Sequence, residues 1–208
     1  MIEAKSLLSY AFVVLGLFLI PGPAVLLTLA RAIGSGRRVG VATGLGIATG
    51  DLCHSVMATL GLSAVLATSA IAFSVVKYAG ALYLIYLGVR AFMEKGESLH
   101  LPAARPISAG QAFRQGILSE VLNPKTALFF LAFLPQFVHP EIGAAIPQFA
   151  VLGGIFVVMS AIYTSLLAVG AGYVGRWLTR HRGVGRWQGK IIGSVYLGLG
   201  LRLAFEKR

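Results

Sequence analysis

Acidic and basic side chains inside long apolar segments are the features of this sequence most able to do chemistry. Of its seven acidic residues, only Asp51 and Glu120 lie inside such segments. An ionisable group at the centre of a bilayer is costly and usually serves transport or proton transfer. His54 follows Asp51 by three residues, which places both side chains on one helical face. Asp51, Glu120 and His54 are therefore predicted to couple transport to protons.

Structural roles are the alternative for each of these three residues. The Asp51 carboxylate would then accept hydrogen bonds from Lys125, or from free backbone N–H groups at the Pro21 break, and would serve only the assembly of the helices. Glu120, nearer the predicted cytoplasmic end, would extend into a wet vestibule. His54 taken alone is equally consistent with a hydrogen-bonded interior histidine.

Lys125 lies in the middle of an apolar segment, directly after Asn123 and Pro124. To reach water, its ammonium group would have to cross about half of the hydrocarbon core. We therefore expect it to meet an acid or a substrate anion. Asn123 adds an amide that both donates and accepts hydrogen bonds.

Two proline breaks interrupt apolar segments that are otherwise long enough to cross a bilayer. Pro21, Gly22 and Pro23 lie near the centre of the first segment, and Pro124 lies near the centre of a later one. Proline donates no N–H and clashes with the carbonyl four residues earlier, so the carbonyls of Leu17, Leu19 and Glu120 lose their usual partners. Backbone carbonyls without a hydrogen-bond partner are tolerated in a membrane only where they are buried in protein or line a wet cavity.

Paired breaks of this kind indicate a transporter binding site at mid-depth. The ends of broken helices offer N–H groups to a carboxylate and free carbonyls to an ammonium group, which suits a small zwitterion. The predicted substrate-binding residues are Pro21, Gly22, Pro23, Asn123, Pro124 and Lys125. Ordinary helix kinks are the alternative for either break taken alone.

The elements that must position these residues are membrane spans. Of the 208 residues, 57% are hydrophobic and 12% are charged, with a mean hydropathy of +0.81. This composition is that of a polytopic membrane protein. Six apolar runs predict an all-α protein of six transmembrane helices, the first and fourth broken, at about 7–33, 39–66, 71–93, 112–138, 147–174 and 189–205.

Charge and repetition predict the orientation and the division of the chain. Lys and Arg gather in the first, third and fifth connections, which the positive-inside rule places in the cytoplasm, with both termini outside. Lys77 and Arg202 depart from this pattern. Residues 94–111 form the predicted cytoplasmic linker between two three-helix repeats, 1–93 and 112–208. With three spans each, the two repeats must be inverted relative to one another.

Other classes of protein lack support in the sequence. The net charge of +11 lies in short connections, with no basic domain for nucleic acid. Neither a nucleotide loop nor a paired-histidine metal motif occurs, so we predict no cofactor, no metal and no enzyme. Cys53 is the single cysteine and excludes an internal disulfide.

Several motifs together resemble the LysE/RhtB family of amino-acid exporters, and its homoserine/threonine-type branch more than its lysine exporters. They are Pro21-Gly22-Pro23, the glycines 40, 44, 46 and 50 before Asp51, Lys77 with Gly80-Ala81-Leu82-Tyr83-Leu84, Gln115-Gly116, Asn123-Pro124-Lys125 and Pro135-Gln136-Phe137. The resemblance implies a bacterial inner-membrane exporter of amino acids or their derivatives, driven by the proton motive force and often dimeric. It covers all the residues proposed above except His54 and Glu120, which rest on depth and chemistry.

The prediction is therefore a proton-coupled amino-acid exporter, with amino acids, protons and membrane lipids as partners and a possible homodimer. A passive facilitator for small zwitterions is the alternative within transport. An intramembrane enzyme using Asp51 and His54 is the alternative from another class, and a purely structural subunit is disfavoured by the embedded charges. The sequence does not identify the amino acid.

Overall fold

The computed structural model is all-helical over the residues it describes, which are 2–19, 22–68, 70–93 and 106–173, with single positions at 190, 194, 197, 198 and 201. The helices follow in the order α1 (Ala4–Leu19), α2 (Pro23–Ser35), α3 (Arg37–Thr68), α4 (Ala70–Met93), α5 (Ala109–Val121), α6 (Pro124–Ala132), the 3-10 turns η1 (Leu134–Phe137) and η2 (Pro140–Ile142), and α7 (Ala145–Val169).

Both predicted breaks are present. The axis bends by 59° between α1 and α2, and by 51° between α5 and the segment that begins with α6. Pro23 and Pro124 each stand in the first turn of the helix after the break. Proline suits that position because its missing N–H would have no helical partner there. The first and fourth predicted spans are therefore broken, as expected; Pro21 itself lies outside the described residues.

The number of spans is only partly established. Within the described residues, α3 and α7 each contain a segment long and apolar enough to cross a membrane, and each bent pair counts as one further span if it crosses as a unit. The helix α4 coincides with the third predicted span, 71–93. The sixth, 189–205, lies outside the described residues apart from the five single positions, as does most of the linker. Six spans in inverted repeats stay a prediction.

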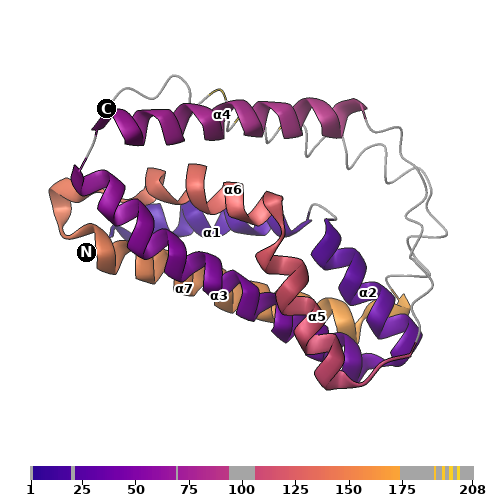
Figure 1. Ribbon diagram of the computed structural model, residues 1–208. Coiled ribbons are helices and arrows are strands. Elements are labelled where there is room, and N and C mark those ends of the chain that lie inside the picture. The colour runs from indigo at the N-terminus through magenta and orange to yellow at the C-terminus, as the bar shows by residue number, and fades with distance from the viewer. Residues whose placement is uncertain are drawn as a thin grey trace.

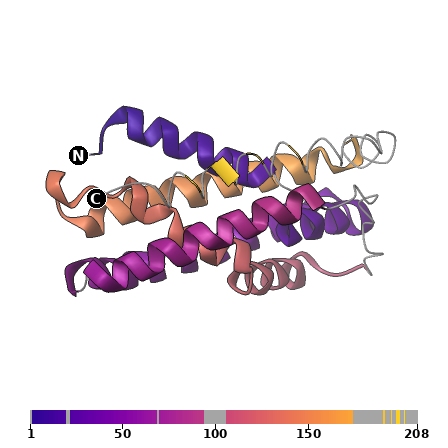
Figure 2. The same ribbon diagram turned by 90° about the horizontal axis from the view of Figure 1, so that it is seen from above.

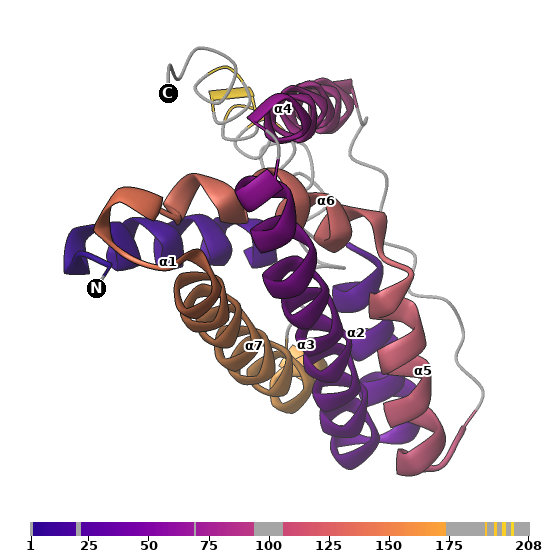
Figure 3. The same cartoon turned by 60° about the vertical axis from the view of Figure 1, so that its left-hand side comes forward.

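The helices bring the two breaks together near the middle of the molecule. The long helices α3 and α7 lie side by side, with α2 and α5 near one end and α1 and α6 near the other (Figures 1 and 3). The helix α4 packs against α6 and α3 and runs along one face of the molecule (Figures 1 and 2). Each break therefore lies between a short helix at one end of the molecule and a short helix at the other: α1 and α2 in the first case, α6 and α5 in the second.

Glycines let α3 approach its neighbours closely. A Cβ atom at Gly50 would lie 2.6 Å from the Cβ of Glu120 in α5, and one at Gly44 would lie 2.6 Å from the hydroxyl of Thr164 in α7. Both distances are shorter than real side chains tolerate. The small residues at four-residue spacing thus serve helix packing. Their close approach sets Asp51, one residue after Gly50, against α5.

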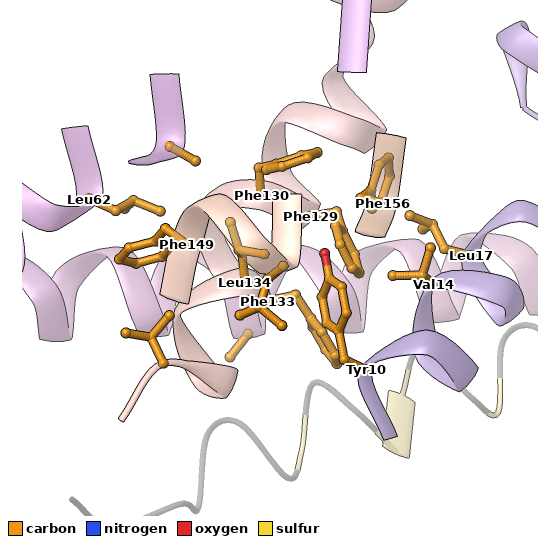
Figure 4. Close-up of a cluster of buried hydrophobic side chains, with 14 residues drawn as sticks. Tyr10, Val14, Leu17, Leu62, Phe129, Phe130, Phe133, Leu134, Phe149 and Phe156 are labelled. Atoms are coloured by element: carbon orange, nitrogen blue, oxygen red, sulfur yellow. The ribbon is translucent and has the colours of Figure 1, made fainter. Parts of the chain in front are cut away.

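An aromatic cluster fills the end of the molecule that holds α1 and α6. It is buried and draws side chains from α1, α3, α6, η1 and α7, among them Tyr10, Phe129, Phe133 and Phe156 (Figure 4). Phe12 is 73% exposed, Leu82 68% and Leu166 68%. Exposed large apolar side chains on the outside of long helices are expected where lipid, and not water, surrounds the protein.

Candidate functional site

Two carboxyl groups meet at the point where the breaks converge. Asp51 is 1% exposed and Glu120 is 2% exposed, and their side chains lie within hydrogen-bonding reach of each other. Two acidic side chains this close together and away from water form a place that attracts a cation or a proton.

Each carboxyl group is held by side chains. The Ser160 hydroxyl in α7 donates to Asp51 at 2.5 Å. Glu120 accepts hydrogen bonds from the Nδ2 of Asn123, at 3.1 and 3.2 Å to its two oxygens, and from the Thr126 hydroxyl. Sequence reasoning missed Ser160 and Thr126. The available signal was a hydroxyl at Ser160 with Thr164 one turn later in an apolar helix, a pattern that by itself favours helix packing.

The carbonyl groups freed by the two breaks find partners across the molecule. The Nζ of Lys125 donates to the Leu17 carbonyl at 2.9 Å, and Leu17 is the residue four places before Pro21. The Nε2 of His54 lies 2.9 Å from the Glu120 carbonyl, four places before Pro124. A carbonyl only accepts, so Nε2 carries the hydrogen. At each break, a side chain that is distant in the sequence thus replaces the lost backbone donor.

These contacts bear on the structural alternatives raised above. His54 is 5% exposed and stacks on Phe130. It is a hydrogen-bonded interior histidine, and its hydrogen-bond partner is the backbone carbonyl of Glu120. Glu120 is buried and does not extend into a vestibule. The Lys125 ammonium group donates to a backbone carbonyl, that of Leu17.

The two helix starts at the breaks differ. Asn123 caps α6, because its side-chain oxygen accepts from the Lys125 N–H at 3.1 Å. Gly22 precedes α2 and offers no side-chain cap. A Cβ atom at Gly22 would lie 3.5 Å from the Lys125 Nζ, so this ammonium group lies beside the uncapped start of α2. The positive end of a helix and a lysine together favour an anion.

A narrow cavity joins these groups. It has a volume of about 30 Å³, which is room for one or two water molecules and not for an amino acid. Its polar lining consists of Asp51, Glu120, Asn123, Lys125, Thr126, Ser160, Tyr163 and Thr164. Its apolar lining includes Leu17, Phe18, Val25 and Ile47. Phe129, Phe130 and Phe133 do not line it and belong to the aromatic cluster.

A larger groove of about 450 Å³ lies between α2 and α5. Among the described residues, its lining is mostly leucine, with Gln115 and Ser119 as the polar residues and no charged group. A zwitterion would find no partner for either charge there. The narrow cavity is therefore the better candidate, although it is smaller.

Comparison with known proteins shows to which family the chain belongs. The model of the LysE type translocator matches residues 15–207. The chain belongs to this family. Its resemblance to the LysE/RhtB exporters is thereby confirmed, and the family is one of translocators.

Relatives match over nearly their whole length. YrhP, an uncharacterized membrane protein of Bacillus subtilis strain 168, is 33% identical over 206 residues, covering 95% of this chain and 97% of the relative. A membrane protein of Vibrio cholerae is 30% identical over 204 residues, covering 96% and 97%. The leucine efflux protein of Enterobacter sp. strain 638 is 29% identical over 205 residues, covering 96% of each chain. No solved structure matches the chain significantly.

Proposed function

We propose that this protein exports amino acids with apolar side chains from bacterial cells by exchanging them for protons across the inner membrane. The observation that carries the proposal is the buried pair Asp51 and Glu120, in a cavity that also holds Lys125 and the uncapped start of α2. Such a cavity offers partners for a carboxylate, an ammonium group and a proton together. Membership of the translocator family and the relatives named leucine efflux protein support the same function.

The carboxylate of the amino acid binds at the start of α2. There it accepts from the free N–H groups of the first turn and from the Lys125 ammonium group, which already lies beside Gly22. Hydrogen bonds between charged partners are about twice as strong as neutral ones. The start of α6 does not compete, because Asn123 already caps it. Pro21, Gly22, Pro23 and Pro124 act by shaping the two breaks, without contributing side-chain bonds.

The ammonium group of the amino acid binds at Asp51 and Glu120 and displaces their shared proton. Binding from the cytoplasm releases one proton inward, and release to the outside lets the pair take up one proton again. Proton and cargo therefore occupy the same pair alternately, which is the condition for antiport. His54 supports the exchange by holding the Glu120 carbonyl in place.

The side chain of the cargo faces apolar residues. Phe18 and Tyr163 stack on each other at 5.5 Å between ring centroids, and both line the cavity with Ile47. An apolar wall favours an aliphatic side chain and leaves a charged one without a partner. Because the cavity admits only water, binding must be accompanied by opening of the helices around it.

Counterflow in proteoliposomes tests this function. Purified protein is reconstituted with a high internal concentration of unlabelled leucine, and the entry of labelled leucine is followed with and without an imposed pH gradient. Exchange of aliphatic amino acids, with net accumulation that follows the gradient, is the expected result. Exchange that ignores the gradient would contradict antiport and favour the facilitator. A lack of exchange across all apolar amino acids would reject the proposed cargo.

A further inference from the structure

Tyr10 carries a buried hydroxyl that packing does not explain. Its side chain is 0% exposed, and its hydroxyl makes no hydrogen bond within the part of the chain that the structure describes. Leaving such a group unpaired costs about 1–3 kcal/mol. Phenylalanine would fill the same space without that cost. Buried polar groups without partners are rare, so the presence of a hydroxyl at this position needs a functional explanation.

The surroundings of Tyr10 are aromatic and apolar. Its ring meets Phe137 edge-on at 5.1 Å and Phe129 at 6.3 Å between centroids. Figure 4 shows the oxygen pointing into the cluster, toward Phe129 and Val14. The same buried cluster contains Leu17, which lines the cavity, and Phe130, which stacks on His54. The hydroxyl therefore lies in an otherwise apolar layer that adjoins the site.

The position of Tyr10 on α1 places it between the cavity and one side of the membrane. Leu17, which lines the cavity, follows Tyr10 by seven residues on the same buried face. Seven residues span about 10 Å along a helix. Tyr10 lies on the side where α1 begins, which the distribution of Lys and Arg predicts to be the outside.

We propose that the Tyr10 hydroxyl passes protons between the outer side and the Asp51 and Glu120 pair. This inference rests on the proposed antiport. A hydronium ion on the outer side gives a proton to the hydroxyl oxygen and becomes water, while the hydroxyl gives its own proton to the Asp51 carboxylate, directly or through a water molecule. One proton enters, one leaves, and Tyr10 ends neutral as it began.

The test is Tyr10→Phe, which removes only the unpaired oxygen. Two control variants accompany it: Tyr173→Phe, the same change at a 72% exposed tyrosine, and Ser63→Ala, which removes another buried hydroxyl without a partner. For each variant we would measure thermal stability, counterflow of labelled leucine, and net accumulation driven by a pH gradient. Counterflow requires no net proton movement, so the two transport assays separate cargo movement from proton supply.

The expected result for Tyr10→Phe is unchanged or raised stability, counterflow within about twofold of wild type, and an initial rate of gradient-driven accumulation that falls tenfold or more. Both controls keep both rates. Gradient-driven transport at the wild-type rate in Tyr10→Phe would overturn the inference and leave antiport standing. An equal fall in both assays would assign Tyr10 to the movement of cargo and also overturn it. A wild-type protein that ignores the gradient would overturn antiport and the inference together.

Discussion

Asp51→Asn is the substitution that most directly probes the proposed coupling. Asp51 is 1% exposed and accepts from Ser160 at 2.5 Å. Asparagine keeps the shape and one acceptor for that hydroxyl, so we expect a change in folding free energy of no more than about 1 kcal/mol. What it removes is the group that gains and loses the proton. The variant should therefore fold and still exchange its cargo, with weaker binding because the ammonium group loses one charged partner, but lose the response to a pH gradient.

The size of that response follows from the stoichiometry. One pH unit is worth about 1.4 kcal/mol per proton, which corresponds to tenfold accumulation when one proton exchanges for one amino acid. In vesicles that are one pH unit more acidic inside, with the membrane potential clamped at zero, wild type should approach a tenfold inward gradient of leucine. Asp51→Asn should approach equal concentrations on both sides.

The control is Glu141→Gln, which removes an exposed acid outside the site and should leave accumulation at the wild-type level. Tenfold accumulation by Asp51→Asn would refute the assignment of the proton to Asp51. A variant that neither folds nor exchanges would not meet the expectation either, because asparagine retains the packing and the hydrogen bond. Glu120→Gln then tests the second carboxyl group in the same assay.

Two further substitutions test the residues that repair the breaks. His54→Gln retains a donor for the Glu120 carbonyl but cannot titrate, so gradient-driven accumulation should stay at the wild-type level; its loss would make His54 a proton carrier. Lys125→Met removes the donor to the Leu17 carbonyl and the predicted partner of the carboxylate. We expect a loss of about 1–3 kcal/mol in stability and a leucine KM at least tenfold higher, measured by thermal unfolding and concentration-dependent counterflow, whereas Lys125→Arg should recover part of both.

The breaks were predictable from the sequence because proline acts locally. The missing N–H of Pro21 or Pro124 identifies the carbonyl that loses its partner, which is the one four residues earlier. No knowledge of the rest of the fold is needed for this step. The partners that replace it were not predictable. Lys125 and Leu17 are 108 residues apart, and His54 and Glu120 are 66 residues apart. Only the close approach of α3 to α5 and α7 brings such groups together.

The same limit explains why Ser160 and Tyr10 were missed. A serine in a membrane helix most often bonds its own backbone or lines a small-residue face, and nothing in the local sequence distinguishes one that donates to a carboxyl group 109 residues away. An aromatic residue in an apolar helix predicts packing, which is correct for the Tyr10 ring. The isolation of its hydroxyl is a property of the assembled cluster and not of any segment.

The bond between Lys125 and the Leu17 carbonyl leads to a prediction about the cargo itself. A carboxylate that draws Lys125 to the start of α2 leaves the Leu17 carbonyl without its donor, at a cost of about 1–3 kcal/mol. The ammonium group of an amino acid supplies a new donor in the same cavity, so a complete amino acid offsets this cost. A carboxylic acid with the same carbon skeleton but no amine cannot.

Such an analogue should therefore inhibit leucine counterflow about 5- to 150-fold more weakly than leucine does. The amide of leucine, which keeps the amine and loses the carboxylate, should also inhibit weakly, because it cannot engage Lys125. Inhibition constants measured for both analogues against labelled leucine check the argument. If the acid without the amine inhibited as well as leucine, the Leu17 carbonyl would need no replacement donor, and the bond from Lys125 would be a passive feature of the closed site.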